Sequence, residues 1–354
     1  MHMGDALVSP AVGGVMLAVA AGMIVYSTVK SKKTMDRKKI PMMGVMAALI
    51  FAGQMINFTI PVTGSSGHIG GGILLAAMLG EGPGVLAITA VLLIQAFFFA
   101  DGGLLALGCN IFNMGFWPCL VIFPLVFKPI LKKGITNGKL MGASILSVVL
   151  ALQLGAFSVV LETLASGITA LPFTAFVALM QPIHLAIGLV EGIVTGLILI
   201  FVYKARPEIL EANINDQSFG ESLNTKKVLV GLLIAAVIIG GGLSLFASSN
   251  PDGLEWAMFG NAEEGYRDGL TTEEELGEGY ESVNEVQEST AFLPDYAFKD
   301  SDSAAGTTTS GIVGSAITLC LAGAAGGIIY GVSKKRKNKA GSDEENKNDL
   351  SAEE

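Results

Sequence analysis

Long apolar segments, separated by short polar stretches, make up most of this chain. A helix needs about 20 consecutive apolar residues to cross a bilayer. The pattern therefore predicts an all-α integral membrane protein, with about seven membrane helices followed by a two-helix C-terminal module. The third predicted span is short, so we expect a half-helix that begins inside the protein. The predicted spans lie near residues 5–29, 41–60, 69–80, 84–100, 103–127, 140–165, 173–203, 228–248 and 310–332.

Polar stretches divide the chain into predicted units. Residues 249–309 contain 15 Asp or Glu against one Arg and one Lys, and such a sequence buries too little apolar area to order itself. We interpret this outer loop either as solvated and mobile or as an acidic antechamber that concentrates cations. The units are a seven-helix module (1–205), a cytoplasmic linker (206–227), a two-helix module (228–334) that contains the outer loop, and a disordered cytoplasmic tail (335–354).

The basic residues predict the orientation of the chain. Four clusters, at 30–39, 128–139, 204–227 and 334–347, hold 20 of the 22 Lys and Arg residues. With nine spans all four fall on one side, which the positive-inside rule identifies as the cytoplasm. The N-terminus is then outside and the C-terminus is cytoplasmic. A cleaved signal peptide would carry positive charge before its apolar run. Here the charge follows, at Lys30, so we expect the first helix to be retained.

The composition excludes several classes of protein. Charged residues make up 15% of the chain, against about 25% in soluble domains. We therefore expect most of its surface to contact a lipid bilayer. Nucleic-acid binding is disfavoured because no basic face exists outside short loops. The three Cys residues, at 109, 119 and 320, lack the spacing of a zinc site or a disulfide framework.

Candidate chemistry centres on the three histidines of the chain, His2, His68 and His184. The Met1 amine and the deprotonated His2 amide can close a five-membered chelate ring. The same amide and the His2 imidazole close a six-membered one, and His68, in an outer glycine-rich loop, could supply a fourth nitrogen. A planar set of four nitrogens suits Ni(II), Cu(II) or low-spin Co(II), and not Zn(II), Mg(II) or Ca(II). The alternative is that His2 is merely the second residue of a start sequence.

Other polar residues lie in or near the spans. Gln54 and Asn57 end the second span near His68, where they either orient the histidine ligands or simply cap a helix. His184 and Glu191 are seven residues apart on one helix face. We interpret this intramembrane polar pair as a hydrogen-bonded lock between helices, with a direct functional role as the alternative. Asp101 is interpreted as a helix-end residue that reaches the membrane surface.

Two glycine repeats at four-residue spacing predict close helix packing. The first comprises Gly188, Gly192 and Gly196, and the second comprises Gly323, Gly327 and Gly331. Docking of another subunit is the alternative for the second repeat.

Several motifs together resemble a known family. They are MHMGDALVSPAVGG at the start, GHIGGG at 67–72, PIHLAIGLVEG at 182–192 and PDGLEW at 251–256. The chain resembles the CbiM/NikM-type substrate-binding component of cobalt/nickel energy-coupling-factor transporters, fused to the small PDGLE-containing CbiN/NikN-type subunit. The resemblance implies that Met1, His2 and His68 bind Co(II) or Ni(II) as transported cargo, with cobalt serving cobalamin biosynthesis. It also implies two cytoplasmic ATPase subunits and a transmembrane coupling subunit as partners.

The chain itself carries no recognisable ATPase. GEGPG at 80–84 lacks the Lys and the Ser/Thr of a P-loop. We therefore expect a metal-capturing subunit of an ATP-driven importer and not an enzyme. The alternatives are a metal-conducting secondary carrier or channel, and an intramembrane metallo-hydrolase that uses His184 and Glu191, although no HExxH motif is present. The sequence leaves cobalt and nickel undistinguished, since the same nitrogen set binds both.

Overall fold

Each of the nine apolar segments contributes a helix to the computed structural model, which describes residues 2–167, 172–220, 222–270, 280–299, 301 and 303–352. The all-α membrane fold is thereby confirmed. The elements are η1 (Asp5–Leu7), α1 (Pro10–Ser31), α2 (Lys39–Gln54), β1 (Phe58–Ile60), β2 (Ser65–Gly67), α3 (Gly72–Leu79), α4 (Glu81–Phe99), α5 (Leu107–Ile111), η2 (Phe112–Phe127), α6 (Lys128–Lys132), α7 (Asn137–Ser166), α8 (Phe173–Ala205), α9 (Pro207–Ile214), α10 (Lys226–Gly241), η3 (Leu243–Phe246), α11 (Gly253–Phe259), α12 (Glu281–Thr290), η4 (Pro294–Tyr296) and α13 (Ala304–Ala352).

Within the described residues, six helices are long and apolar enough to cross a membrane. They are α1, α4, the continuous α5–η2–α6 helix, α7, α8 and α13. Helix α2 is apolar but shorter, at 16 residues. The chain is therefore a multi-pass membrane protein.

Local sequence explains where several of these helices begin and end. The Ser9 side chain accepts a hydrogen bond from the Val12 N–H, and Pro10 occupies the first turn of α1, a position where proline costs no hydrogen bond. Thr136 caps α7 in the same way, and Gly167 ends that helix in the left-handed conformation.

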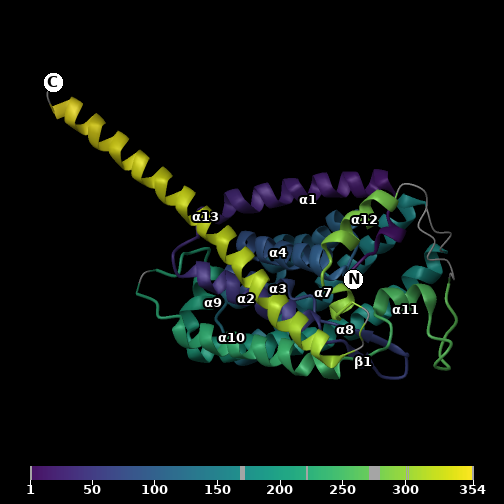
Figure 1. The fold of residues 1–354 in the computed structure, drawn as a ribbon. Coiled ribbons are helices and arrows are strands. Elements are labelled where there is room, and N and C mark those ends of the chain that lie inside the picture. The colour runs from purple at the N-terminus through teal and green to yellow at the C-terminus, as the bar shows by residue number, and fades with distance from the viewer. Residues whose placement is uncertain are drawn as a thin grey trace.

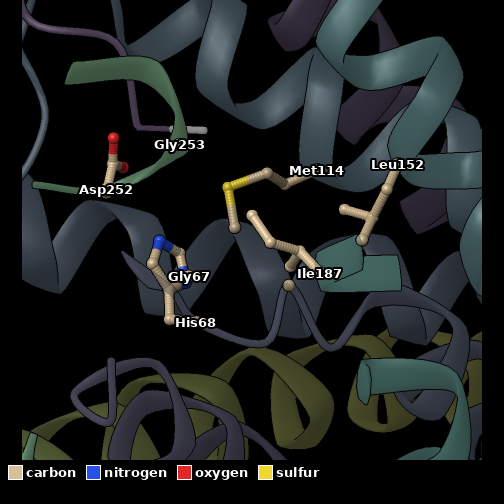
Figure 2. A pocket seen from close by; sticks show the side chains of 8 residues that line it. Gly67, His68, Met114, Leu152, Ile187, Asp252 and Gly253 are labelled. Atoms are coloured by element: carbon tan, nitrogen blue, oxygen red, sulfur yellow. The ribbon is translucent and has the colours of Figure 1, made fainter. Parts of the chain in front are cut away.

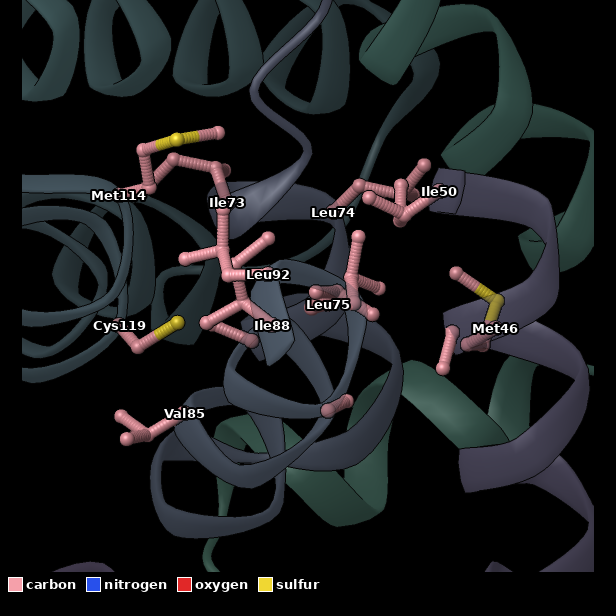
Figure 3. Packing of buried hydrophobic residues seen from close by; sticks show 14 of the residues in the cluster. Met46, Ile50, Ile73, Leu74, Leu75, Val85, Ile88, Leu92, Met114 and Cys119 are labelled. Carbon is pink, nitrogen blue, oxygen red and sulfur yellow. The ribbon is translucent and has the colours of Figure 1, made fainter. Parts of the chain in front are cut away.

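Helix α3 is a buried half-helix. Its eight residues are all buried, and they span only about 12 Å at 1.5 Å per residue. Gly80, with φ of 93°, reverses the chain so that α4 begins at the next residue. Figure 3 shows the α3 side chains Ile73, Leu74 and Leu75 packed between α2, α4 and η2. The half-helix thus begins inside the protein, as its short apolar segment predicted.

The segment after α2 differs from the prediction. The second span was expected to continue to residue 60, but α2 ends at Gln54 and an antiparallel hairpin follows. Strand β1 pairs with β2 in the register Phe58↔Gly67. Pro61 and Gly64, which has φ of 71°, favour a turn between the two strands. Residues 55–67 therefore leave the helix and shape the loop that carries His68.

The helix Leu107–Lys132 widens into a π-helix over η2. Pro118 and Pro124 lie inside this segment and cannot donate the N–H groups that a regular α-helix requires at their positions. The wider winding accommodates both prolines without ending the helix.

The two-helix module packs against the first module through α2. Helix α2 contacts both α10 and α13, and a Cβ at Gly44 would lie 2.8 Å from the Leu319 carbonyl oxygen. Helices α10 and α13 approach each other closely at Gly240 and Gly311. As a result, 14 of the 16 residues of α2 are buried.

Three of the basic clusters meet at one end of the molecule. Glu81 pairs with Lys30 and with Lys128, which also contacts Asp216 at 2.5 Å. The buried Lys39 donates to the Asn213 side chain at 2.8 Å. Asn213 belongs to α9, so the region predicted as a linker contains a helix that is packed against this end.

The end of the chain also differs from the prediction. A disordered tail was expected over 335–354, whereas α13 continues as a helix to Ala352 and projects beyond the other helices (Figure 1). The tail sequence is rich in Lys and Glu, which favour helix, and α13 continues through Gly341 without a break.

The two glycine repeats behave differently. A Cβ at Gly188, Gly192 or Gly196 would lie 3.2 Å or less from α7 atoms, which confirms the predicted close packing of α8 on α7. The second repeat, on α13, has no atom within 4 Å of the corresponding Cβ positions. It therefore takes no part in the packing of the described chain.

Candidate metal centre

The N-terminal segment is inserted into the protein and held by one asparagine. The Met3 N–H donates to the Asn110 side-chain oxygen at 2.8 Å, and the Asn110 amide donates back to the Met3 carbonyl at 3.1 Å. Gly103 N–H also donates to that carbonyl at 2.9 Å. Met3 is fully buried. The backbone next to His2 is therefore fixed on both its donor and its acceptor side.

The structure brings His2 and His68 together. Their rings are stacked, with centroids 5.0 Å apart and an interplanar angle of 21°. Burial lowers the pKa of His68 to about 3, and the charges of the chain terminus and of His2 add to this effect. Burial also lowers the pKa of His2, against the opposite effect of Asp101. Both imidazoles are thus neutral at pH 7, which is the form that binds a metal. Met1 lies outside the described residues.

Buried polar side chains from three helices hold the loop that follows His68. The Glu191 carboxylate accepts the Gly70 N–H at 2.7 Å and the Gly71 N–H at 2.8 Å. The Gln54 amide donates to the Gly70 carbonyl at 2.9 Å, and Gln95 donates to the Gln54 side chain at 2.8 Å. The chain after His68 is therefore fixed by α8, α2 and α4.

The glycines of the GHIGGG segment permit this close packing. Gly71 has φ of 80°, which residues with a side chain rarely adopt. A Cβ at Gly71 would lie 2.5 Å from Ile50, one at Gly72 would overlap Pro118, and one at Gly67 would overlap Ile187. These contacts give the small residues around His68 a steric reason.

The remaining predicted residues lie in different settings. Gln54 contacts the His68 loop directly, whereas Asn57 lines the outer cavity described below. His184 and Glu191 are both buried, but they make no hydrogen bond to each other. His184 Nδ1 lies 2.8 Å from the Met180 carbonyl of its own helix. Its Nε2 has no hydrogen-bond partner in the described part of the chain.

Asp101 is a site residue that the sequence analysis interpreted otherwise. Its carboxylate lies 3.6 Å from His2 Nδ1 and accepts a hydrogen bond from the Tyr296 hydroxyl of the second module. The only signal available was its place, directly after the span that ends near residue 100 on the same side as His2. Helix α12 adds a second link, because Gln287 donates to the carbonyls of Ala96 and Gly102.

The PDGLE motif also reaches the His68 loop. The Ser66 N–H donates to the Pro251 carbonyl at 2.8 Å. Asp252 then begins α11 with a capping box, in which its carboxylate accepts the Leu254 and Glu255 N–H groups. Figure 2 shows Asp252 and His68 in one pocket. Burial opposes ionisation of Asp252, but the positive charge of the chain terminus holds its pKa below the usual range.

A cavity of about 990 Å³ opens onto the two histidines, and both modules line it. The described part of the outer loop, which includes α11, α12 and η4, forms one wall. The cavity is acidic, and its carboxylates are Asp5, Asp101, Asp252, Glu255 and Asp295. This geometry is compatible with the antechamber interpretation of the acidic loop.

Among the described residues, no group of three or more His, Cys, Asp or Glu side chains could hold a metal ion. The predicted ligand set does not depend on such a group, because two of its four nitrogens come from the chain terminus and the backbone. A site of the predicted kind would not be revealed by clustering of side chains alone.

Comparison with known proteins identifies both modules. The family model CbiM, described as cobalt uptake substrate-specific transmembrane region, matches residues 2–209. A second family model, the PDGLE domain, matches residues 226–331.

Two relatives carry names that describe fused proteins. A protein of Archaeoglobus fulgidus that carries the name fused nickel transport protein NikMN is 28% identical over 91% of this chain and 96% of its own length. The fused nickel transport protein NikMN of Rhodobacter capsulatus is 29% identical over 59% of this chain and 64% of that protein. The crystal structure of a truncated transition metal transporter matches with a TM-score of 0.51 and 28% identity, over 58% of this chain and 99% of that one.

Proposed function

This chain belongs to the CbiM family of cobalt uptake substrate-specific transmembrane proteins, and we propose that it captures Co(II) or Ni(II) outside the cell for ATP-driven import. It is a cobalt/nickel transport protein and not an enzyme. Two of its relatives are named as fused nickel transport proteins. Those names leave open which of the two metals this chain prefers.

The proposed ligands are the Met1 amine, the His2 amide, the His2 imidazole and the His68 imidazole. Two fused chelate rings at the terminus supply three nitrogens, and His68 supplies the fourth. Four nitrogens in a plane favour the d-electron configurations of Ni(II) and low-spin Co(II). The two hydrogen bonds between the Asn110 side chain and the Met3 backbone support this set, because they fix the position of the adjacent His2 backbone.

The single observation that carries the proposal is the contact of His2 with His68. The two residues are far apart in the sequence, yet their rings lie 5.0 Å apart. Both residues line an acidic cavity, which would raise the local concentration of cations. The chain terminus with the His2 imidazole, placed beside the His68 imidazole, would supply the nitrogen ligands that a transition metal needs.

Substitution of each histidine tests the proposed ligands. We expect His2→Ala to abolish high-affinity Ni(II) and Co(II) binding, because the variant loses one ligand and the six-membered ring. His68→Ala should weaken binding strongly but leave the tridentate terminus. His184→Asn is the matched control, since within the described residues the third histidine hydrogen-bonds only to its own helix. Titration of the purified full chain measures all three, and parental affinity in both alanine variants would place the site elsewhere.

We further propose that transport requires two cytoplasmic ATPases and a transmembrane coupling subunit, and that the N-terminus lies outside. The basic clusters gathered at one end of the molecule support this orientation. Uptake of Ni(II) into vesicles should need ATP and the partner subunits. Uptake by the chain alone, down a gradient, would instead favour a secondary carrier or channel.

A further inference from the structure

Glu191 is a buried carboxylate in a membrane helix, and its partners are unusual. Only 3% of the residue is exposed. Within the described residues it forms no ion pair, and both carboxylate oxygens accept backbone N–H groups, those of Gly70 and Gly71. Ionisable groups inside a membrane are costly and are retained for function. This carboxylate therefore has one evident task, which is to hold the Gly70–Gly71 backbone.

The two N–H groups form an anion-binding concavity. They are successive along the chain, and Gly71 adopts the left-handed conformation with φ of 80°, a geometry in which neighbouring N–H groups converge on one anion. Gly71 is also the residue directly before α3, so the carboxylate lies at the positive end of that helix. Glu191 thereby fixes both the direction of the loop and the start of α3.

His68 lies between this clamp and the β-hairpin. On its N-terminal side, Gly67 pairs with Phe58 in the hairpin. On its C-terminal side, Gly70 is held by Glu191 through its N–H and by Gln54 through its carbonyl. Removal of the Glu191 contacts would free the C-terminal side, and the His68 imidazole would lose its fixed place.

We propose that Glu191 is a positioning residue of the metal site, which acts on the metal through the His68 loop and does not bind the metal itself. The proposal rests on the function proposed above, and it assigns to Glu191 a role distinct from that of His184. The two residues share one face of α8, but among the described hydrogen bonds only those of Glu191 extend to the loop.

Glu191→Gln is the sharpest variant. A carboxylate offers acceptors on both oxygens, whereas glutamine replaces one oxygen with an NH₂ donor. One of the two glycine N–H groups would then face a donor and remain unsatisfied, which is costly in a buried place. Glu191→Asp keeps both acceptors but withdraws them by one methylene, so it provides a second variant should the first fail to fold.

The experiment compares the full-length chain and its variants by Ni(II) titration and by the visible spectrum of the bound Ni(II). We expect Glu191→Gln to weaken binding by about 10- to 100-fold, as loss of a group that orients a ligand does. Its spectrum should shift toward that of His68→Ala, because both variants lose the fourth nitrogen. His184→Asn, the matched control on the same helix face, should retain the parental affinity and spectrum.

A double variant separates positioning from general damage. In the His68→Ala background, Glu191→Gln should have no further effect on affinity if it acts through His68. Additive losses would overturn the proposal, and so would a parental affinity and spectrum in a folded Glu191→Gln or Glu191→Asp variant. These results leave the proposed function intact provided that His68→Ala itself weakens binding. Parental affinity in both His2→Ala and His68→Ala would instead refute the proposed site.

Discussion

At the scale of single residues, the proposed chelate depends on a free α-amino group. We predict that one residue added before Met1, or acetylation of Met1, abolishes high-affinity binding although every side chain remains. The addition turns the amine into an amide and removes one ring of the chelate. Ni(II) titration of the extended chain, with an extension at the C-terminus as the control, checks this. Normal binding by the N-terminally extended chain would contradict the terminal chelate.

The sequence predicted the proposed ligands because their chemistry is local. The start of the chain and one histidine in a glycine-rich loop were enough to suggest a planar nitrogen set. The residues that hold those ligands could not be predicted in the same way. Asn110 lies in an apolar stretch with no informative spacing, and Asp101 is an ordinary acid at a helix end. Glu191 was recognised as polar and intramembrane, but its partners are backbone N–H groups, which have no signature in the sequence.

At the scale of helices, the contact between α10 and α13 depends on the absence of side chains. A Cβ at Gly311 would overlap the backbone of Gly240. We predict that Gly311→Ala lowers the free energy of unfolding by about 1–3 kcal/mol, as overpacking does in well-packed cores. Gly323→Ala, on the same helix but with no atom within 4 Å, should change it little. Thermal unfolding in detergent measures both, and equal stability of the two variants would show that the close contact is unimportant.

Hydropathy located all the long helices because burial in lipid leaves a strong signal in composition. It could not locate features that depend on hydrogen bonding or on tertiary contacts. The π-helix of η2 depends on how the helix around Pro118 and Pro124 packs against its neighbours, and this packing is not visible in the sequence. The hairpin over 58–67 is too short to leave a clear alternation. Helix α9 is too short to be located by hydropathy, and its position depends on Asn213, which bonds both Lys39 and the Ala77 carbonyl.

At the scale of the whole molecule, the first module is proposed to bind the ion and the second to attract it to the site. All the proposed ligands belong to the first module, while Asp252, Glu255 and Asp295 of the second line the outer cavity. We predict that a chain ending after Asn224 still binds Ni(II), with an equilibrium affinity no more than about tenfold below that of the full chain. Its association rate should fall by about tenfold at low salt, because the steering field is weaker.

Stopped-flow association at two ionic strengths provides the measurement. The rate for the full chain should fall steeply as salt is raised, whereas the rate for the shortened chain should change less. Each preparation is first checked for a single symmetric elution peak. A shortened chain that is folded but holds no metal would place ligands in the second module.

The peptide between α9 and α10 has a consequence for assembly. Eleven residues join the two modules, so their encounter is intramolecular and takes place at an effective concentration of about the millimolar range. Because both modules are synthesised as one polypeptide, their ratio is one to one at any level of expression. Dilution in a growing membrane cannot separate the Tyr296 hydroxyl from Asp101, because both belong to one chain. If the modules were two separate chains, they would dissociate once their concentration fell below their dissociation constant.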